Sequence, residues 1–212
     1  MILVFGSSGQ VARELMARLT DAVFLGREQA DLAGDTDIGR IVEDVNPDAI
    51  INAAAYTAVD KAEEEEDIAL KVNAQAPSEM AGAAAKLQIP LVHISTDYVF
   101  DAAGEEPFVP GGMAAPLGAY GRTKLTGEEA IAAIAPDYAI LRTSWVFSAH
   151  GANFLKTMLR LSETREQLTI VSDQVGGPAP EAEKDEEGVE KRGGMRGGRK
   201  KGGGKTILGR AG

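Results

Sequence analysis

Short apolar runs alternate with longer amphipathic segments along residues 1–175 of this chain. The runs have the length of strands buried on both faces, whereas the longer segments carry apolar residues at helical spacing. The predicted strands are Met1–Phe5, Ala22–Leu25, Ala49–Asn52, Leu91–Ser95, Tyr138–Arg142 and Leu168–Val171. The predicted helices are Gln10–Leu19, Ile38–Val45, Ala62–Leu87, Ala119–Ile134 and Asn153–Ser162. Strands separated by helices form βαβ units, so the pattern predicts an α/β fold with a Rossmann-like, doubly wound parallel sheet.

The composition changes abruptly after Pro178, where an acidic block is followed by a block of Gly, Arg and Lys without apolar period. Such a segment cannot bury enough apolar surface to offset the entropy lost on ordering. We therefore predict a Rossmann-type domain over residues 1–178 and a disordered, charged, Gly-rich tail over residues 179–212. The tail is either a solvated segment without a role or a Gly/Arg arm for nucleic acid.

Charge and composition limit the classes of partner. The net charge is −10, and residues 181–212 hold six acidic and nine basic residues, so residues 1–180 carry −13. An acidic body argues against nucleic-acid binding. The chain has no cysteine and two histidines, which fits a reducing cytoplasm and gives no basis for a transition-metal site. No run approaches the roughly 18–20 apolar residues of a membrane helix, so we expect a cytoplasmic protein without membrane contact.

A glycine-rich turn follows the first predicted strand, in the sequence Gly6-Ser7-Ser8-Gly9. Gly6 permits the tight turn, and Gly9 lets the backbone approach a pyrophosphate. Ala12 occupies the third glycine position and is small enough for the helix to pack close to the sheet. The turn therefore predicts a dinucleotide site with its phosphates at the start of the following helix.

Arg27 follows the second predicted strand, where the adenosine ribose of a dinucleotide lies. An acidic residue there selects the free 2′-hydroxyl, whereas an Arg accepts a 2′-phosphate. Arg27 thus favours NADPH, with NADH and a solvated surface Arg as the alternatives. Ala54 and Ala55 follow the third strand and are small enough for a backbone that passes close to a flat cofactor, although core packing also explains them.

Tyr120 and Lys124 stand four residues apart on a predicted helix, so their side chains lie one turn above each other. A Lys ammonium beside a phenol favours the phenolate, and we expect it to lower the pKa of Tyr120 from about 10. Thr96 ends the fourth strand, where open α/β sheets bind ligands, and its hydroxyl can polarise a carbonyl. The alternative is that Thr96 caps a strand and Tyr120 lies on a surface helix. The order of these motifs predicts a nucleotide-dependent oxidoreductase.

Seven stretches up to about Pro178 carry a family resemblance: FGSSGQVA, NAAAYTAVDKAE, HISTDYVFD, AYGRTKLTGE, LRTSWVF, NFLKTMLRL and DQVGGP. They resemble the extended short-chain dehydrogenase/reductases and, within them, the dTDP-4-dehydrorhamnose reductase family. The resemblance implies NAD(P)H-dependent reduction of the 4-keto group of a dTDP-sugar in dTDP-L-rhamnose synthesis. It leaves open whether the protein is a monomer or a homodimer and whether it binds Mg²⁺.

The resemblance also implies residue roles, grouped by the ligand that each set would contact. The cofactor would be bound by Gly9, Gln10 and Val11 at its pyrophosphate, by Asp31 and Leu32 at its adenine, and by Ala54, Ala55 and Tyr56 at its middle. Tyr120 would donate the proton, and Lys124 would hold the nicotinamide ribose. The sugar nucleotide would contact Thr96, Asp97 and Trp145, with Asn153 and Lys156 as further candidates.

The chain departs from the family after Pro178, because family members continue well past this point and build much of their substrate lobe there. We therefore expect a substrate lobe that is largely missing, and a chain that is either a working reductase or one inactivated by truncation. Two other functions stay open. One is a non-catalytic NADP-binding regulator, against which intact Thr96, Tyr120 and Lys124 argue. The other is an epimerase or dehydratase, for which Asp97 would be the acid beside Thr96.

Overall fold

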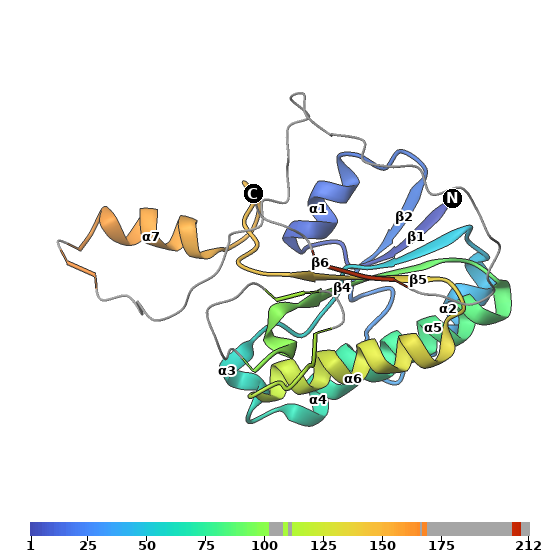
Figure 1. Cartoon of the computed structure of the whole chain (residues 1–212). Coiled ribbons are helices and arrows are strands. Elements are labelled where there is room, and N and C mark those ends of the chain that lie inside the picture. The colour runs from blue at the N-terminus through green and yellow to red at the C-terminus, as the bar shows by residue number, and fades with distance from the viewer. Residues whose placement is uncertain (102–107, 110–111, 166, 169–204, 209–212) are drawn as a thin grey trace, which may run out of the picture.

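The computed structural model describes residues 1–101, 108–109, 112–165, 167–168 and 205–208. In these residues one parallel sheet has the strand order β2-β1-β3-β4-β5-β6 (Figure 1). The strands are β1 (Ile2–Phe5), β2 (Ala22–Leu25), β3 (Ala49–Asn52), β4 (Leu91–Thr96), β5 (Tyr138–Thr143) and β6 (Lys205–Leu208). The parallel, Rossmann-like sheet predicted from the sequence is confirmed.

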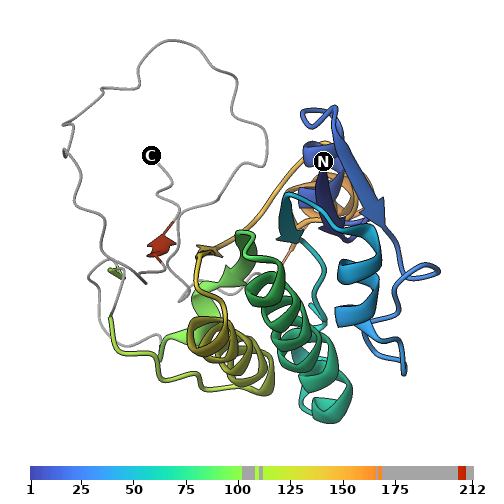
Figure 2. The same ribbon diagram turned by 90° about the vertical axis from the view of Figure 1, so that its right-hand side faces the viewer.

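Helices lie on both faces of the sheet. The α-helices are α1 (Gln10–Met16), α2 (Ile38–Val45), α3 (Val59–Ala62), α4 (Glu66–Leu70), α5 (Ala76–Leu87), α6 (Ala119–Ile134) and α7 (Phe154–Ser162). A π-helix, η1 (Lys71–Gln75), joins α4 to α5, and a 3₁₀-helix, η2 (Asp97–Val99), follows β4. Figure 2 shows α2, α5 and α6 side by side, while α1 lies on the opposite face and α7 extends away from the body (Figure 1). No described helix is long and apolar enough to cross a membrane.

The main hydrophobic core lies between the sheet and the layer of α2, α5 and α6. Leu3 and Phe5 of β1 and Ile50 of β3 are almost fully buried there, against Val42 of α2 and Met80 of α5. Strand side chains alternate between faces, so these positions belong to one face of the sheet.

The strand order places a topological switch at β1. This strand pairs with β2 on one side and with β3 on the other, so the chain leaves β1 in one direction and later returns to its opposite edge. In open α/β sheets, ligands bind beyond the carboxyl ends of the strands at such a point. The Gly6–Gly9 turn directly follows β1 and therefore lies at the expected binding position.

The first five strands agree with the sequence prediction within one residue at each end. The long helix predicted over Ala62–Leu87 instead begins at Glu66 and contains a π-helical segment. The structure has α4, then the π-helix η1, and then α5 in that segment. Pro77 gives the physical reason, because it has no N–H to donate to the carbonyl of Asn73 four residues earlier. A regular α-helical ladder cannot run through this point, and a π-turn takes its place.

The tail is described over four residues only. Within the segment predicted to be disordered, Lys205–Leu208 forms β6 and pairs in parallel with β5, and there the structure differs from the prediction. Its Thr, Ile and Leu favour an extended chain, unlike the Gly-rich stretch before it. Residues 169–204, with most of the predicted strand Leu168–Val171, lie outside the described residues. The division into residues 1–178 and 179–212 stays a prediction.

Gly127 lets α6 pack directly against the π-helix. A Cβ at this position would lie 2.0 Å from the backbone oxygen of Asn73. We expect Gly127→Ala to lower the free energy of unfolding by about 1–3 kcal/mol, because α6 or η1 must shift. Gly82→Ala is the matched control, since nothing lies within 4 Å of a Cβ on Gly82 in α5. It should stabilise by roughly 0.5–1 kcal/mol. Equal urea midpoints for the two variants would contradict this close packing.

Candidate active site

One groove of about 1110 Å³ lies at the carboxyl ends of β1, β3, β4 and β5. Of the residues expected from the sequence to contact cofactor or substrate, all but Asn153 and Lys156 line it. Those at the groove are Gly6, Gly9, Gln10, Val11, Arg27, Asp31, Leu32, Ala54, Ala55, Tyr56, Thr96, Asp97, Tyr120, Lys124 and Trp145. The fold thus brings together residues more than a hundred positions apart, whereas their individual roles stay predictions.

The glycine-rich turn has the shape that a bound dinucleotide requires. Gly6 has a φ of 105°, and a Cβ there would lie 3.1–3.2 Å from the backbone of Ala53 and Ala54, so only glycine fits without strain. Nothing lies within 4 Å of a Cβ built on Gly9. The backbone at Gly9 is therefore open to a phosphate group, and the turn fits an NAD(P) pyrophosphate.

Arg27 and Asp31 line the groove just beyond β2. Their side chains make an ion pair, with Arg27 Nε 3.3 Å from Asp31 Oδ1, and the Arg27 side chain is 79% exposed. Such an exposed pair is weak, so the guanidinium can turn to a phosphate. Asp31 also accepts a hydrogen bond from the backbone N–H of Ala33, which fixes the loop that contains Leu32.

The middle of the groove is held by Asn73, a buried residue of η1 that the sequence analysis missed. Its Oδ1 accepts a hydrogen bond from the backbone N–H of Tyr56 at 2.9 Å. Its Nδ2 donates to the backbone oxygen of Tyr56 and to Thr123 Oγ1 of α6. The π-turn at η1 therefore ties the loop after β3 to the helix that carries Tyr120 and Lys124.

Thr96 ends β4 with its side chain toward Tyr120. The Thr96 hydroxyl interacts with that of Tyr120, and its oxygen lies 3.2 Å from Asp97 Oδ1. Ser144 donates to the other oxygen of Asp97, at 2.7 Å, and Tyr98 packs edge-on against the Tyr120 ring. The predicted pair of hydroxyl groups is thus assembled in one place, and together they can hold a carbonyl oxygen.

The expectation that Lys124 lowers the pKa of Tyr120 is wrong for this structure. Burial raises the pKa of Tyr120 to about 12, although the hydrogen bond to Thr96 acts in the opposite direction. Burial also lowers the pKa of Lys124 to about 7. The reason is geometric, because Lys124 Nζ contacts His93 Nε2 at 2.9 Å and donates to the backbone oxygen of Ile94 at 2.7 Å. Tyr120 is therefore a protonated phenol, as a proton donor must be.

A buried ion pair between Arg142 and Glu128 lies next to this site. Arg142 of β5 donates from Nη2 to Glu128 Oε2 of α6 at 2.6 Å, and from Nε to Oε1 at 3.1 Å. Ser95 also donates to Glu128, and the Arg142 guanidinium lies 4.8 Å from the centre of the Phe100 ring. The network joins the carboxyl ends of β4 and β5 to α6, one turn beyond Lys124.

The remaining candidates lie at the other rim. Trp145 is 39% exposed, has a φ of 49°, and packs edge-on against Phe154 of α7. Asn153 caps α7 by accepting from the backbone N–H of Lys156, and it donates to Gln10 Oε1 at 2.9 Å. The Lys156 ammonium donates to the backbone oxygen of Ala149. Asn153 therefore acts on the groove through Gln10, whereas Trp145 lines it.

Acid should destabilise this protein, because His93 and Lys124 are both buried in their neutral forms. Burial lowers the pKa of His93 well below its ordinary 6.5. Below pH 6.5 the unfolded chain therefore binds more protons at His93 than the folded chain does. The same holds at Lys124 between about pH 7 and 10.5. Stability rises with pH across each window. We expect the urea-derived free energy of unfolding to increase from about pH 5 to 7 to 9. His93→Gln should flatten the acid side, and a stability maximum near pH 5 would contradict the account.

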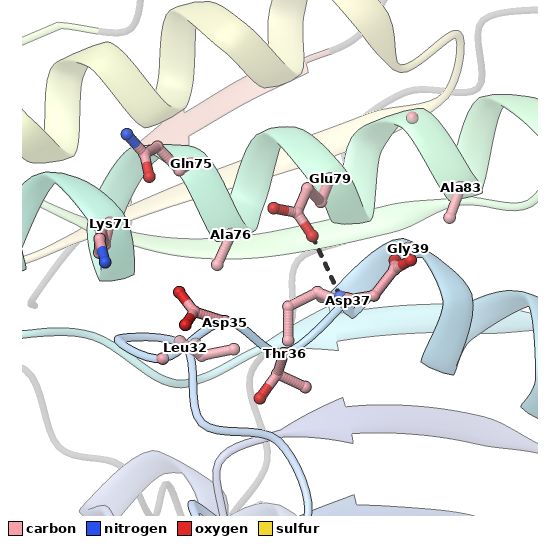
Figure 3. Close-up of a pocket in the computed structure, with 13 residues that line it drawn as sticks. Leu32, Asp35, Thr36, Asp37, Gly39, Lys71, Gln75, Ala76, Glu79 and Ala83 are labelled. Carbon is pink, nitrogen blue, oxygen red and sulfur yellow. Dashed lines mark hydrogen bonds between the residues drawn. The ribbon is translucent and has the colours of Figure 1, made fainter.

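A second groove, of about 520 Å³, lies between the start of α2 and the helices η1 and α5 (Figure 3). Two of its acidic side chains are already engaged, since Glu79 accepts from the backbone N–H of Ile38 and Asp37 from that of Arg40. Leu32 is its only residue among the candidates. In the part of the chain that the structure describes, no group of three or more His, Asp or Glu side chains is placed to hold a metal ion.

Known proteins are similar to this chain over most of its length. A family model described as the RmlD substrate binding domain matches residues 1–183. A dTDP-4-dehydrorhamnose reductase of Burkholderia thailandensis is 47% identical over 180 residues, which are 84% of this chain and 60% of that protein. The crystal structure of a dTDP-4-dehydrorhamnose reductase of Clostridium acetobutylicum has a TM-score of 0.81 and 39% identity, over 85% of this chain and 65% of that one. The Bacillus anthracis dTDP-4-dehydrorhamnose reductase in complex with NADP has a TM-score of 0.81 and 35% identity, over 85% and 66%. The chain thus spans about three fifths of the length of the curated relatives it matches.

Proposed function

The chain belongs to the RmlD substrate binding domain family, and from this premise we propose that it is an NADPH-dependent reductase of a dTDP-linked keto sugar. The substrate would be dTDP-4-dehydro-L-rhamnose, whose 4-keto group is reduced to give dTDP-L-rhamnose. One observation carries the proposal: Thr96, Tyr120 and Lys124 line a single groove together with the Gly6–Gly9 turn. The names of the relatives, dTDP-4-dehydrorhamnose reductases, supply the substrate.

Tyr120 is the proton donor of the proposed reaction. Its phenol is protonated at neutral pH because its pKa is about 12, and its hydroxyl is already bonded to that of Thr96. A carbonyl oxygen that replaces this contact would receive hydrogen bonds from both groups, which stabilise negative charge developing on the oxygen. Tyr120 gives its proton to that oxygen. A bound reduced nicotinamide would supply the hydride to the carbonyl carbon.

The rest of the groove would bind and orient the two ligands. Gly6 and Gly9 give the cofactor pyrophosphate close access to the backbone, and Arg27 would meet the 2′-phosphate of NADPH. Asp97 and Trp145 would contact the sugar nucleotide at the opposite rim. Binding of this kind accelerates reaction by holding hydride donor, carbonyl and phenol in line.

A dehydratase or epimerase is less well supported by the geometry. It would use Asp97 as an acid or base, yet both oxygens of Asp97 accept hydrogen bonds, from Thr96 and Ser144. Both oxygens of Asp97 are therefore already engaged by hydroxyl donors within the protein. A non-catalytic NADP-binding regulator would use the same cofactor contacts without Tyr120.

The test is the oxidation of NADPH by the purified chain, followed by the absorbance of the reduced nicotinamide. Oxidation should depend on the keto sugar nucleotide and should be slower with NADH. The regulator is the correct assignment if the chain binds NADPH but leaves it unoxidised in the presence of substrate. The dehydratase is correct if the sugar nucleotide is converted without net consumption of NADPH.

A further inference from the structure

Behind the proposed catalytic pair, three polar side chains form a buried row that the sequence analysis did not use. Asn52 ends β3, His93 lies in β4, and Lys124 lies in α6, and each is at most 1% exposed. Asn52 Nδ2 is 3.0 Å from His93 Nδ1, and His93 Nε2 is 2.9 Å from Lys124 Nζ. Lys124 lines the groove, whereas Asn52 and His93 do not. His93 therefore reaches the groove only through Lys124.

The orientation of the Asn52 amide fixes where the proton of His93 lies. Asn52 Oδ1 accepts a hydrogen bond from the backbone N–H of Ala54 at 3.1 Å, so the amide nitrogen must face the imidazole ring. An amide nitrogen only donates, and His93 Nδ1 is therefore an acceptor. A neutral imidazole with a bare Nδ1 carries its proton on Nε2. That proton points at Lys124 Nζ.

A nitrogen that accepts this proton must have a lone pair, which an ammonium group lacks. We infer that at mildly alkaline pH His93, in its Nε2–H form, holds Lys124 as an uncharged amine as long as no cofactor is bound. His93 is a positioning residue in this account, since it acts on the groove through Lys124 alone. The inference rests on the proposed function in one respect, namely that NADP(H) binds in the groove beside Lys124.

The charged groups around Lys124 agree with an uncharged amine. Glu128, one turn along α6, raises the pKa of Lys124, but Arg142 of β5 neutralises that carboxylate. Tyr120, one turn earlier, has a pKa raised to about 12 and carries no charge. Asp97 of η2 is bonded by Ser144 and Thr96. Burial remains the largest effect and lowers the pKa of Lys124 to about 7.

Cofactor binding should then draw a proton onto Lys124. The phosphates of NADP(H) bring negative charge into the groove and favour the ammonium form. At about pH 8 we expect the uptake of close to one proton per bound NADP(H), and much less at about pH 6, where Lys124 is already charged. Calorimetric titrations in buffers of different ionisation enthalpy measure this number. Uptake that does not change with pH would contradict the inference.

The direct test is the tautomer of His93 in the cofactor-free, full-length protein labelled with ¹⁵N-histidine. The chain has only two histidines, so His150→Gln leaves the His93 ring as the one signal pair. We expect a protonated Nε2 and a bare Nδ1, together with a Lys124 ¹³Cε signal that titrates near pH 7. A ring protonated on Nδ1, or on both nitrogens, would overturn the inference, whether or not the protein proves to be a reductase.

Asn52→Asp is the matched variant, because it keeps the acceptor for Ala54 and places a second acceptor opposite His93 Nδ1. It should move the ring proton to Nδ1, free Nε2 to accept from an ammonium, and raise the pKa of Lys124. Proton uptake at about pH 8 should then disappear. A folded Asn52→Asp protein that keeps the Nε2–H tautomer would overturn the proposed control by Asn52 and His93. If this variant does not fold, the measured tautomer of His93 in the parent chain alone decides whether the inference holds.

Discussion

Replacing Tyr120 with Phe should lower turnover about a hundredfold or more, because the reaction loses its general acid. The ring would keep its edge contact with Tyr98 and its place in the groove, so the affinity for NADPH should change little. Turnover is measured by NADPH oxidation in the presence of the keto sugar nucleotide, and affinity by the quenching of protein fluorescence.

Tyr138→Phe is the matched control for this prediction. Tyr138 begins β5, at the opposite end of the sheet from the groove. Its replacement by Phe removes the same phenol hydroxyl without touching the proposed site. Its turnover should stay close to that of the parent chain. Equal turnover in Tyr120→Phe and the parent would remove Tyr120 from the mechanism, whereas equal losses in both variants would mean a general effect on the fold.

Replacing Glu128 with Gln should lower the free energy of unfolding by about 3–5 kcal/mol, because it leaves the buried Arg142 guanidinium without a counter-charge. Both side chains of this pair are at most 8% exposed. Arg142 Nη1 is already buried without a hydrogen-bond partner, so no further hydrogen bond compensates for the lost carboxylate. Unfolding in urea, followed by circular dichroism, measures the loss.

Glu129→Gln is the control, since Glu129 is the next residue on α6 and is exposed. It should change stability by no more than about 0.5 kcal/mol. The double variant Glu128→Leu/Arg142→Met removes both charges and should recover most of the loss. A Glu128→Gln protein as stable as Glu129→Gln would show that the ion pair contributes nothing to the fold.

The strands and the groove could be predicted from the sequence because their signals are local. Val4 and Ile50 belong to short apolar runs bounded by Gly, Asn or Pro. Such runs are typical of buried parallel strands. The fold then brings the ends of these runs together at one edge of the sheet. The order of the Gly-rich turn, Thr96 and Tyr120 along the chain therefore predicts that they share one site.

The electrostatics of the site could not be predicted in the same way. The four-residue spacing correctly places Lys124 on the same helical face as Tyr120, but it says nothing of what the strands below present to the amine. His93 lies in β4 and Asn52 in β3, and the pairing of these strands places the two side chains in contact although they are 41 positions apart in the sequence. Their signal in the sequence is a polar residue within an otherwise apolar strand, which indicates a buried hydrogen-bonded group.

The π-turn that interrupts the α-helical pattern of the long helix has a signal in the sequence. Pro77 interrupts the hydrogen-bond ladder, yet the helical periodicity on either side of it continues. Asn73 depends on that break, because the π-turn aims its amide at Tyr56 and Thr123. β6 was not predicted either, since its four residues lie within a tail whose overall composition favours disorder.

The central claim is that this chain, which spans about three fifths of its relatives, moves a hydride from NADPH to the keto carbon of a dTDP-sugar. The most direct test uses NADPH that carries deuterium in place of the transferred hydrogen, followed by mass spectrometry of the sugar nucleotide. The account predicts a product with one deuterium on C4 from the parent chain, and about a hundredfold less of it in the same time from Tyr120→Phe. A parent chain that binds the labelled NADPH and yields no deuterated sugar would contradict it.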